Sequence, residues 1–355
     1  MKIVQILYSF DMGGIENFAM DLANYLSYDN IDNSIIFTSK GRDEKWCAQK
    51  IEKIKKTNTN LYEAFGSNKF TKFIKLIKLL KTIKPDIIIC HHERNAFRLI
   101  FANLFVRTKI IQIQHNTQIN IKNIHKYFVK YFISKYIGVS AKVLTNLKNN
   151  IKIKEEKGIH INNGIVLDRF SNIKRKDKEH IVIGGVGRLH EQKNFIGFVH
   201  VVTSIIDENP NFNIKVLIAG DGEQKEQIVN LIKNYTNISL LGNVSNMKDF
   251  YEKIDIYMTC SKYEGLSLAL LEAIATKCVV ITTKTSGSSQ IIKNNYNGYV
   301  IPQQNEQLFK EKLITLIENK AIREKFIING EKKIAEYDFS NTYKQYKKVF
   351  EEIIK

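Results

Sequence analysis

Short apolar runs alternate with segments of helical periodicity along most of the chain. The runs are rich in Ile and Val with few polar interruptions, which is typical of parallel strands buried on both faces. In the first half we predict strands at 2–8, 33–38, 86–90, 109–114 and 136–139, with a weaker one near 158–162. In the second half we predict strands at 180–186, 213–219, 237–241, 255–259 and 278–282. The alternation of strand and helix predicts the α/β class, with parallel sheets built from βαβ units.

A polar, Lys-rich run at 171–180 interrupts this pattern and is expected to link two domains. Beyond it a new strand–loop–helix series begins, and 355 residues exceed the usual length of one domain. We therefore predict two Rossmann-like domains facing a central cleft, at 1–170 and 171–339. The last segment, 340–355, has aromatic and apolar residues at helical spacing and is predicted to be a helix.

The composition of the chain indicates the cellular compartment of the protein. No apolar run approaches the roughly 18 residues of a membrane span. Residues 1–8 read as a first strand, because their apolar stretch is too short for a signal peptide. The four cysteines have no Cys-x-x-Cys spacing and none of the density of a disulfide scaffold. We expect a cytoplasmic protein.

The net charge of +18 favours a polyanionic partner: nucleic acid, an anionic membrane or phosphorylated substrates. A Lys excess spread evenly over the surface is the alternative, but two segments concentrate it. At 69–84 Lys recurs at every third position, and a helix packed on the sheet with its Lys side in water is favoured over membrane contact. At 121–136 Lys122, Lys126 and Lys130 interleave with Tyr and Phe, which suits a membrane interface and a plain amphipathic helix equally.

Two carboxylates, Glu264 and Glu272, lie eight residues apart around an apolar helix. With about 1.5 Å rise per residue, seven or eight helical steps would separate them by roughly 10–12 Å. That distance is too long for a pair that shares one water, but it suits an extended polar ligand such as a nucleotide-sugar. A turn Glu and an ordinary helix Glu are the alternative.

Arg188 and Lys193 lie between the strand predicted at 180–186 and a helix predicted from Asn194 onward. Two cations beside a helix N-terminus form a diphosphate site. The alternative is that they are ordinary solvated loop residues. This alternative is favoured for either residue alone and less favoured for both together. Gly13 and Gly14 follow the first strand, where glycine allows backbone N–H groups to approach a phosphate or simply forms a tight turn.

In their joint order and spacing these motifs resemble the GT-B-fold retaining glycosyltransferases of family 4, also called group 1, of the bacterial surface-polysaccharide type. The resemblance extends over nearly the whole chain. Its motifs are Gly13-Gly14-Ile15-Glu16, Pro85-Asp86-Ile87-Ile88, Gln114-His115-Asn116, Val139-Ser140, Asn163-Gly164-Ile165, Gly187-Arg188, Lys193-Asn194, Ala219-Gly220-Asp221-Gly222-Glu223, Leu241-Gly242, Ser261-Lys262-Tyr263-Glu264-Gly265, Glu272-Ala273 and Asn297-Gly298-Tyr299-Val300.

The resemblance implies transfer of a hexose or N-acetylhexosamine from a nucleotide-sugar, with UDP favoured, to a growing lipid-linked oligosaccharide of capsule, O-antigen or exopolysaccharide. It also implies a cytoplasmic enzyme that associates peripherally with the inner face of the plasma membrane, whose surface is anionic. The N-terminal domain would be the acceptor side, and 340–355 would cross back onto it. Another GT-B enzyme, such as a nucleotide-sugar epimerase, is one alternative. A basic nucleic-acid-binding protein is another alternative. The chain lacks a recognisable nucleic-acid-recognition motif, so no nucleic-acid partner is expected.

The resemblance also assigns roles to residues of this chain. Glu264 would bind hydroxyls of the donor sugar and Glu272 those of the ribose. His115, at the end of a strand, would lie beside the donor sugar, with a structural hydrogen-bonding role as the alternative. The implied catalytic set is Glu264, Arg188, Lys193 and His115. The implied donor-binding set is Gly13, Gly14, Gly187, Asp221, Gly222, Glu223, Gly265, Leu266, Ser267 and Glu272, with Glu16 as the acceptor-side candidate.

No metal or other cofactor is expected. The nearest mimic of an Asp-x-Asp pair, Asp221 with Glu223, matches the family's Gly-Asp-Gly loop instead, so Arg188 and Lys193 would take the place of a metal. His91 and His92 resemble metal ligands, but adjacent strand residues point to opposite faces. No enzymic nucleophile is visible, and the resemblance implies a front-face mechanism with the leaving phosphate as base. The chain departs from the family at 288–292, where many relatives have a Glu before the Ile pair, which leaves the local contact and the preferred donor open.

Overall fold

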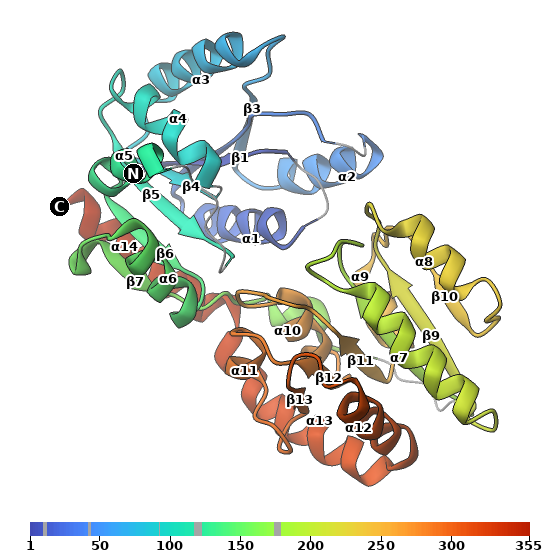
Figure 1. Ribbon diagram of the computed structural model, residues 1–355. Coiled ribbons are helices and arrows are strands. Elements are labelled where there is room, and N and C mark those ends of the chain that lie inside the picture. Colours follow the sequence, from blue (N-terminus) through green and yellow to red (C-terminus); the bar gives the residue numbers. More distant parts are fainter. Residues whose placement is uncertain (10–12, 42–43, 92, 117–122, 174–178) are drawn as a thin grey trace. The chain divides into compact units, whose positions relative to one another are not determined.

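The computed structural model describes residues 1–9, 13–41, 44–91, 93–116, 123–173 and 179–355 (Figure 1). The chain divides into two compact units. Unit 1 comprises Met1–Asn163 and Phe339–Lys355, and unit 2 comprises Gly164–Asp338. Part of the predicted linker, residues 174–178, lies outside the described residues. Each unit is a parallel sheet flanked by helices, which confirms the predicted α/β class with two Rossmann-like parts.

Unit 1 contains a seven-stranded sheet in the order β3-β2-β1-β4-β5-β6-β7, and every pairing in it is parallel. Its strands are β1 Lys2–Leu7, β2 Asp32–Phe37, β3 Thr59–Glu63, β4 Ile87–Cys90, β5 Lys109–Gln114, β6 Lys135–Gly138 and β7 Gly158–His160. Its helices are α1 Gly14–Tyr28, α2 Glu44–Lys55, α3 Lys69–Ile83, α4 Glu93–Asn103, α5 Asn123–Phe132, α6 Ala141–Ile151 and, from the end of the chain, α14 Phe339–Ile354.

The strand period of two distributes the core of unit 1 over both faces of its sheet. In β2, Ile36 packs with residues of α3, α4, α5 and α6, whereas its neighbours Ile35 and Phe37 pack with α1 and α2. In β4 all four residues are buried, as expected for a central strand covered on both sides. The two core layers hold the carboxyl ends of β1, β4 and β5 in fixed positions.

Unit 2 contains a six-stranded parallel sheet in the order β10-β9-β8-β11-β12-β13. Its strands are β8 Ile181–Val186, β9 Ile214–Ala219, β10 Ile238–Leu240, β11 Ile256–Thr259, β12 Val279–Thr283 and β13 Tyr299–Ile301. Its helices are α7 Phe195–Glu208, α8 Lys225–Ile232, α9 Met247–Lys253, α10 Leu268–Ala275, α11 Ser288–Ile291, α12 Glu306–Glu318 and α13 Lys320–Ile334.

Both sheets reverse their strand order at one point. The reversal falls between β1 and β4 in unit 1 and between β8 and β11 in unit 2. In open parallel sheets the connections on the two sides of such a point diverge, and ligands bind beside the carboxyl ends of those strands. The fold therefore provides one candidate binding edge in each unit.

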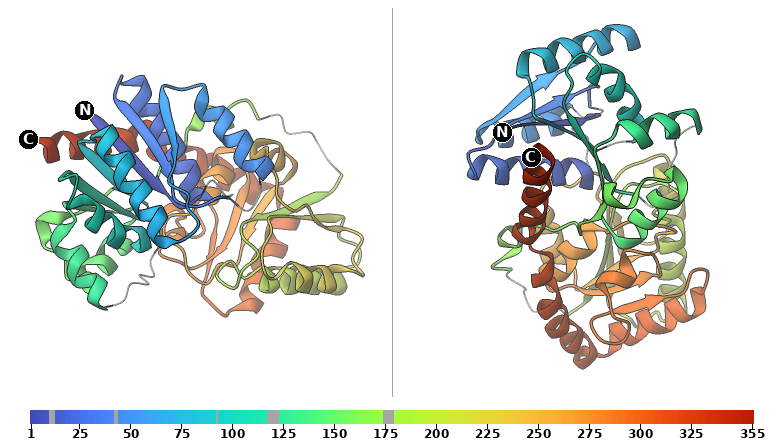
Figure 2. Two further views of the ribbon diagram at one scale, coloured as in Figure 1. Left: turned by 90° about the horizontal axis from the view of Figure 1, so that it is seen from above. Right: turned by 90° about the vertical axis from the view of Figure 1, so that its left-hand side faces the viewer.

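Helix α14 packs within unit 1 although the chain reaches it from unit 2 (Figure 2). Its Phe339 and Tyr346 rings pack against Phe18 of α1, with ring centroids 5.5 and 5.6 Å away. At the end of α1, Asp29 accepts hydrogen bonds from the Tyr343 hydroxyl at 2.6 Å and from Lys347 Nζ at 2.8 Å. Both bonds keep the pKa of Asp29 below its ordinary value.

Every predicted strand is present, with ends that differ by one or two residues. Two strands, β3 and β13, were not predicted. Strand β3 lies at the edge of its sheet and is only partly buried, so its sequence lacks a continuous apolar run. Strand β13 is three residues long, which is too short for a periodic signal. Among the described residues, no helix is long and apolar enough to cross a membrane.

Candidate active site

Two loops meet at the point in unit 2 where the strand order reverses. One follows β8 and carries Arg188 and Lys193, and the other follows β11 and carries Glu264. The backbone of Gln192 accepts a hydrogen bond from Lys262 N at 2.8 Å, and its side chain donates to Tyr263 O at 3.0 Å. These bonds fix the two loops to each other, so the predicted residues on them occupy one site.

The centre of this site is an ion pair between the buried Glu264 and the half-buried Lys193. Lys193 Nζ donates to Oε1 of Glu264, and Ser261 Oγ donates to the same oxygen at 2.6 Å. Burial alone would raise the pKa of Glu264, but the charge of Lys193 and hydrogen bonds from Lys193, Ser261 and Ser267 outweigh it. The pKa of Glu264 therefore lies below its ordinary value, and the carboxylate is anionic at neutral pH.

Arg188 differs from Lys193 in its surroundings. Its side chain is exposed, and no hydrogen bond or ion pair joins it to another described residue. The side chain of Lys193, by contrast, is only 23% exposed, and Glu264 neutralises its charge. The site thus presents one uncompensated cation near the start of α7, whose peptide dipoles add partial positive charge.

The loop after β9 packs directly on the loop after β8. Gly220 has a φ of +140°, and a Cβ on it would lie 1.9 Å from the carbonyl oxygen of Gly187. Only glycine permits both the backbone conformation and this approach. Asp221 accepts from the Gly222 amide at 2.8 Å and from Lys225 Nζ at 3.1 Å. These contacts place the predicted Asp221–Glu223 segment beside the Arg188 loop.

Glu272 lies on α10, which begins at Leu268, with Ser267 as its N-cap. The segment from Glu264 to Ser267 is not helical, so the helical rise used to predict the separation of Glu264 and Glu272 applies only from Leu268 onward. The half-buried Glu272 accepts a hydrogen bond at Oε2 from the Tyr251 hydroxyl at 2.9 Å. Burial and the Glu272 charge hold the pKa of Tyr251 well above its usual value, so this hydroxyl keeps its proton.

The 286–292 segment, which includes the stretch 288–292 where the chain departs from the family pattern, contacts the Glu264 loop through its first two residues. A Cβ on Gly287 would lie 1.6 Å from Gly265 O, and Ser286 Oγ donates to Glu264 O at 2.7 Å. Ser288 Oγ donates to Thr283 O at 2.9 Å and so closes the turn after β12. This segment therefore supports the backbone of Glu264 and Gly265.

In unit 1 the predicted residues follow β1 and β5. Gly13 is the N-cap of α1, and Gly14 is its first residue. The carboxylate of Glu16 folds back over Gly13, where a Cβ would lie 2.3 Å from Oε2, and Glu16 is buried. A buried carboxylate in the first helical turn stabilises that end of the helix. This placement orients Glu16 toward the N-terminus of α1.

His115 follows β5 and is half-buried. Its Nε2 lies 3.3 Å from Nδ1 of His91, which follows β4, and His91 Nε2 lies 2.9 Å from Oε1 of Gln5 in β1. His91, Tyr251 and Ser261 were not in the predicted set. His91 could have been found from its place at the end of a strand beside the reversal point. Its neighbour His92 lies outside the described residues, and those residues contain no cluster that could hold a metal ion.

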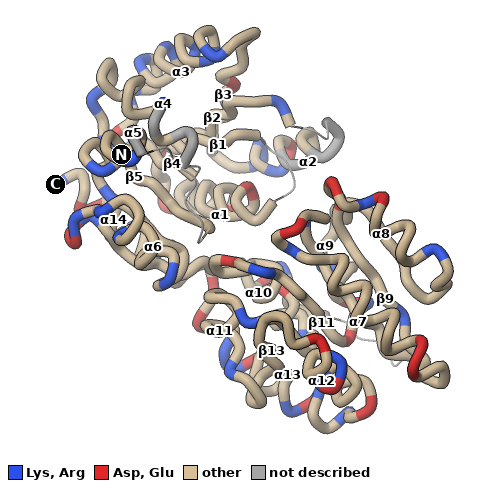
Figure 3. Tube along the Cα trace, in the orientation of Figure 1, with Lys and Arg blue, Asp and Glu red and all other residues tan. Residues whose placement is uncertain are grey.

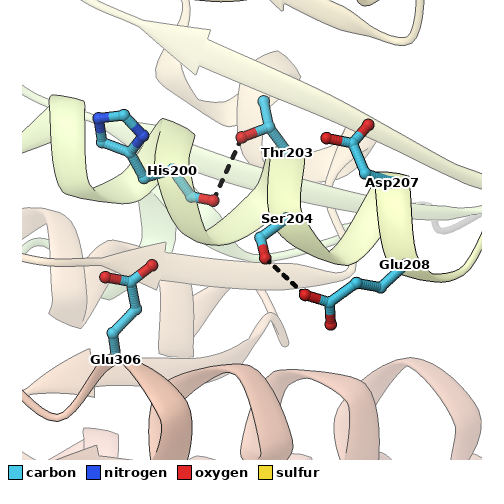
Figure 4. A pocket seen from close by; sticks show the side chains of 6 residues that line it. All are labelled: His200, Thr203, Ser204, Asp207, Glu208 and Glu306. Carbon is cyan, nitrogen blue, oxygen red and sulfur yellow. Dashed lines mark hydrogen bonds between the residues drawn. The ribbon is translucent and has the colours of Figure 1, made fainter.

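A hollow on unit 2 lies elsewhere, between α7 and α12. It has a volume of about 450 Å³ and is lined by His200, Thr203, Ser204, Asp207, Glu208 and Glu306 (Figure 4). Its Ser204 donates to Glu208 at 3.0 Å, and Glu208 pairs with Lys310 at 2.6 Å. None of the predicted site residues lines this hollow, so it is separate from the candidate active site.

Comparison with known proteins places these sites in context. The family model described as Glycosyltransferase Family 4 matches residues 12–169, and the one described as Glycosyl transferases group 1 matches residues 168–333. A Campylobacter jejuni protein is 26% identical over 99% of both chains, and is named a GalNAc-alpha-(1->4)-GalNAc-alpha-(1->3)-diNAcBac-PP-undecaprenol alpha-1,4-N-acetyl-D-galactosaminyltransferase. The amylovoran biosynthesis glycosyltransferase AmsD of Erwinia amylovora is 25% identical over 88% of this chain and 89% of its own.

Solved structures share the fold of this chain. Anabaena HepE, in its complex with UDP-glucose, has a TM-score of 0.84 and 15% sequence identity, covering 99% of this chain and 100% of its own. At that identity the likeness shows the fold.

Proposed function

Since the chain belongs to the family 4, group 1 glycosyltransferases and has the GT-B fold, we propose that it transfers a hexose or N-acetylhexosamine from a UDP-sugar to a lipid-linked oligosaccharide with retention of configuration. The product would be part of a capsule, O-antigen or exopolysaccharide. The observation that carries this proposal is the partly buried Lys193–Glu264 pair beside the exposed Arg188, at the candidate binding edge of unit 2.

The reaction develops negative charge on the β-phosphate as its bond to the anomeric carbon breaks. Arg188 and the start of α7 would stabilise that charge. Lys193 would contribute to the same stabilisation once the donor is bound. The anionic Glu264 would accept hydrogen bonds from donor-sugar hydroxyls. The acceptor oxygen would bond to the anomeric carbon on the face that the phosphate leaves, and its proton would pass to the departing phosphate oxygen, which gives retention.

Glu272 is proposed to bind the ribose of the nucleotide. What supports this is its fixed orientation, because Tyr251 holds Oε2. Tyr251→Phe should weaken UDP affinity by about tenfold or more, since removing a hydrogen bond to a charged group costs about 1.5–3 kcal/mol. Glu272→Ala should weaken UDP affinity further. Neither variant should change turnover much at saturating donor. Tyr257→Phe is the matched control, because Tyr257 is also buried and lies in the same cluster, with its ring 6.1 Å from that of Tyr251.

The acceptor is proposed to be lipid-linked. Support comes from the Campylobacter jejuni relative, whose name describes a glycan on diphosphoundecaprenol. Transfer to an undecaprenyl-diphosphate-linked oligosaccharide should therefore exceed transfer to the same free oligosaccharide.

Metal independence is proposed on the charges of the site, since Arg188 and Lys193 can oppose the charge of the leaving group. Turnover should persist in excess EDTA. A loss that added Mg²⁺ or Mn²⁺ restores would contradict this.

A panel of UDP, GDP, ADP and their sugars tests the donor directly. A ligand that binds the folded state raises the melting temperature by mass action, by about 2.7 kcal/mol of stabilisation at one hundred times its Kd. UDP and its sugars should produce the largest shift, and NMR of the product should show an α-linkage from an α-linked donor. Inversion at the anomeric carbon, or donor turnover without glycan formation, would contradict the proposed reaction.

Attachment to an anionic membrane surface is proposed for unit 1. Helices α3, α4 and α5 pack in one layer on its sheet, and aromatic side chains in and around them face solvent: Phe70 is 70% exposed, Phe105 57% and Tyr127 64%. Lys and Arg residues follow the same helices, most clearly α3 (Figure 3). Exposed aromatics beside Lys are typical of a surface that enters a membrane interface.

A further inference from the structure

A chain of polar side chains crosses the sheet of unit 1 beneath His115. Gln5 of β1 donates from Nε2 to the Ala19 carbonyl of α1 at 3.0 Å. Its Oε1 lies 2.9 Å from His91 Nε2, and His91 Nδ1 lies 3.3 Å from His115 Nε2. Gln5 and His91 are buried, 0% and 2% exposed. Gln5 lies in β1, and His91 and His115 directly follow β4 and β5. These three strands are adjacent in the sheet.

The chemistry of these contacts sets the direction of each hydrogen bond. The Gln5 amide cannot be reversed, because its oxygen would then face the oxygen of Ala19. An amide oxygen only accepts, so His91 must carry a proton on Nε2. A neutral His91 then has its lone pair on Nδ1 and must accept from His115. Neutral His115 therefore carries its proton on Nε2 and its lone pair on Nδ1.

Packing holds both imidazole rings in place. They lie edge to edge and nearly coplanar, at an angle of 24° and with centroids 5.5 Å apart, as an N–H···N hydrogen bond between them requires. Phe18 contacts both rings edge-on, at 6.1 Å from His91 and 5.5 Å from His115. Phe18 is itself held by Phe339 and Tyr346 of α14. The ring of His115 therefore has a fixed position as well as a fixed bond.

We propose that Gln5 and His91 are positioning residues that hold His115 as the Nε2-protonated tautomer, so that it meets the donor sugar through Nδ1 as a hydrogen-bond acceptor. This inference rests on the proposed function and on the position beside the donor sugar that the family resemblance implies for His115. Fixing one tautomer in advance removes the cost of selecting it when substrate binds. It also selects donors that present a hydroxyl, which donates, at that position.

The first test reads the tautomer without any activity assay. Long-range ¹H–¹⁵N correlation spectra of the full chain at pH 8 should show His115 with a protonated Nε2 and an unprotonated Nδ1, and its signals are identified by their loss in His115→Ala. In Gln5→Met, which is similar in shape but cannot accept from His91, both tautomers of His115 should appear. Gln112→Met is the matched control, because Gln112 is equally buried in the same sheet and bonds to Gln114. It should leave the His115 spectrum unchanged.

The second test is a double-mutant cycle in turnover. Gln5→Met should lower kcat about tenfold, as expected when the partner of a functional imidazole is removed. The same change should have no further effect in a His115→Ala background, whereas a merely structural role would multiply the two losses. Melting temperatures of all variants separate folding defects from the effect on turnover.

The outcomes distinguish this inference from the proposed function. A mixture of tautomers in the wild-type spectrum, or additive losses in the cycle, would overturn the positioning role of Gln5 and His91 alone. Wild-type turnover in His115→Ala would overturn the role of His115 and the positioning role together. A single Nε2-protonated tautomer that is lost in Gln5→Met, with a non-additive cycle, would support the inference.

Discussion

Lys193 and Glu264 neutralise each other inside unit 2, so replacing one of them leaves the other without its counter-ion. Lys193→Ala should destabilise the protein by about 3 kcal/mol, because an uncompensated buried carboxylate is costly. It should also reduce turnover by roughly 10²–10³-fold. Adding Glu264→Gln should restore much of the melting temperature but not the turnover.

Arg188→Ala is the informative partner experiment, since Arg188 is exposed and has no such counter-ion among the described residues. Its turnover should fall by roughly 10²–10³-fold with an unchanged melting temperature. Thermal unfolding and initial rates at saturating donor measure both quantities. Near-wild-type turnover of either single variant would contradict the diphosphate assignment.

The lowered pKa of Glu264 makes stability depend on pH. A carboxyl group with a folded-state pKa below its unfolded-state value contributes stability above the unfolded-state pKa, and this is lost as pH falls through the folded-state value. The free energy of unfolding of the wild type should therefore fall more steeply below about pH 4.5 than that of Glu264→Gln. Urea unfolding between pH 7 and pH 3 measures the difference. Parallel curves would show that Glu264 is not held in its charged form by folding.

The loops after β8 and β9 depend on Gly220, where side-chain volume and backbone conformation can be tested separately. Gly220→Ala would bring a Cβ to 1.9 Å from Gly187 O and should displace the Arg188 loop. We expect it to lower both the melting temperature and UDP affinity. Gly242→Ala is the matched control, since Gly242 also has a positive φ, +66°, but has nothing within 4 Å of the added Cβ. It should cost about 1–2 kcal/mol of stability and leave UDP affinity unchanged.

The sequence predicts strands and loops well because each depends on neighbouring residues. Ile87 to Cys90 form an uninterrupted apolar run, so β4 could be recognised, and Arg188 and Lys193 were placed correctly on the β8–α7 connection. Pairings between distant residues could not be predicted. Lys193 and Glu264 are 71 positions apart, and Gln5 and His91 are 86 apart. Their contacts depend on strand order, which periodicity alone does not determine.

The charge of the protein, +18, should produce a measurable affinity for anionic vesicles. Each Lys near such a surface contributes on the order of 1 kcal/mol, and salt screens it within a Debye length of about 10 Å at 0.1 M. Binding in a co-sedimentation assay should therefore fall steeply as salt rises and be nearly absent on neutral vesicles.

Matched variants locate the contact. Lys122 lies outside the described residues, and Lys310 is paired with Glu208, so neither is suitable. Replacing Lys126 and Lys130 of α5 with Gln should weaken vesicle binding more than replacing the exposed Lys325 and Lys332 of α13. Tyr127→Ser should weaken it further, at every salt concentration. Equal effects of the two double variants would mean that Lys excess is diffuse, and no binding at low salt would argue against a lipid-linked acceptor.

The position of α14 affects the order in which a newly made chain can fold. Unit 2 is one continuous segment and is complete once residue 338 has left the ribosome, whereas unit 1 lacks α14 until residues 339–355 have been made as well. At about 5–20 residues per second, residues 164–338 take roughly 10–35 s to synthesise. Throughout that time Phe18 lacks Phe339 and Tyr346, and the rings that hold His91 and His115 have no support from α14. The half of the protein made first is therefore completed last, and nascent unit 1 exposes an apolar face that chaperones can bind.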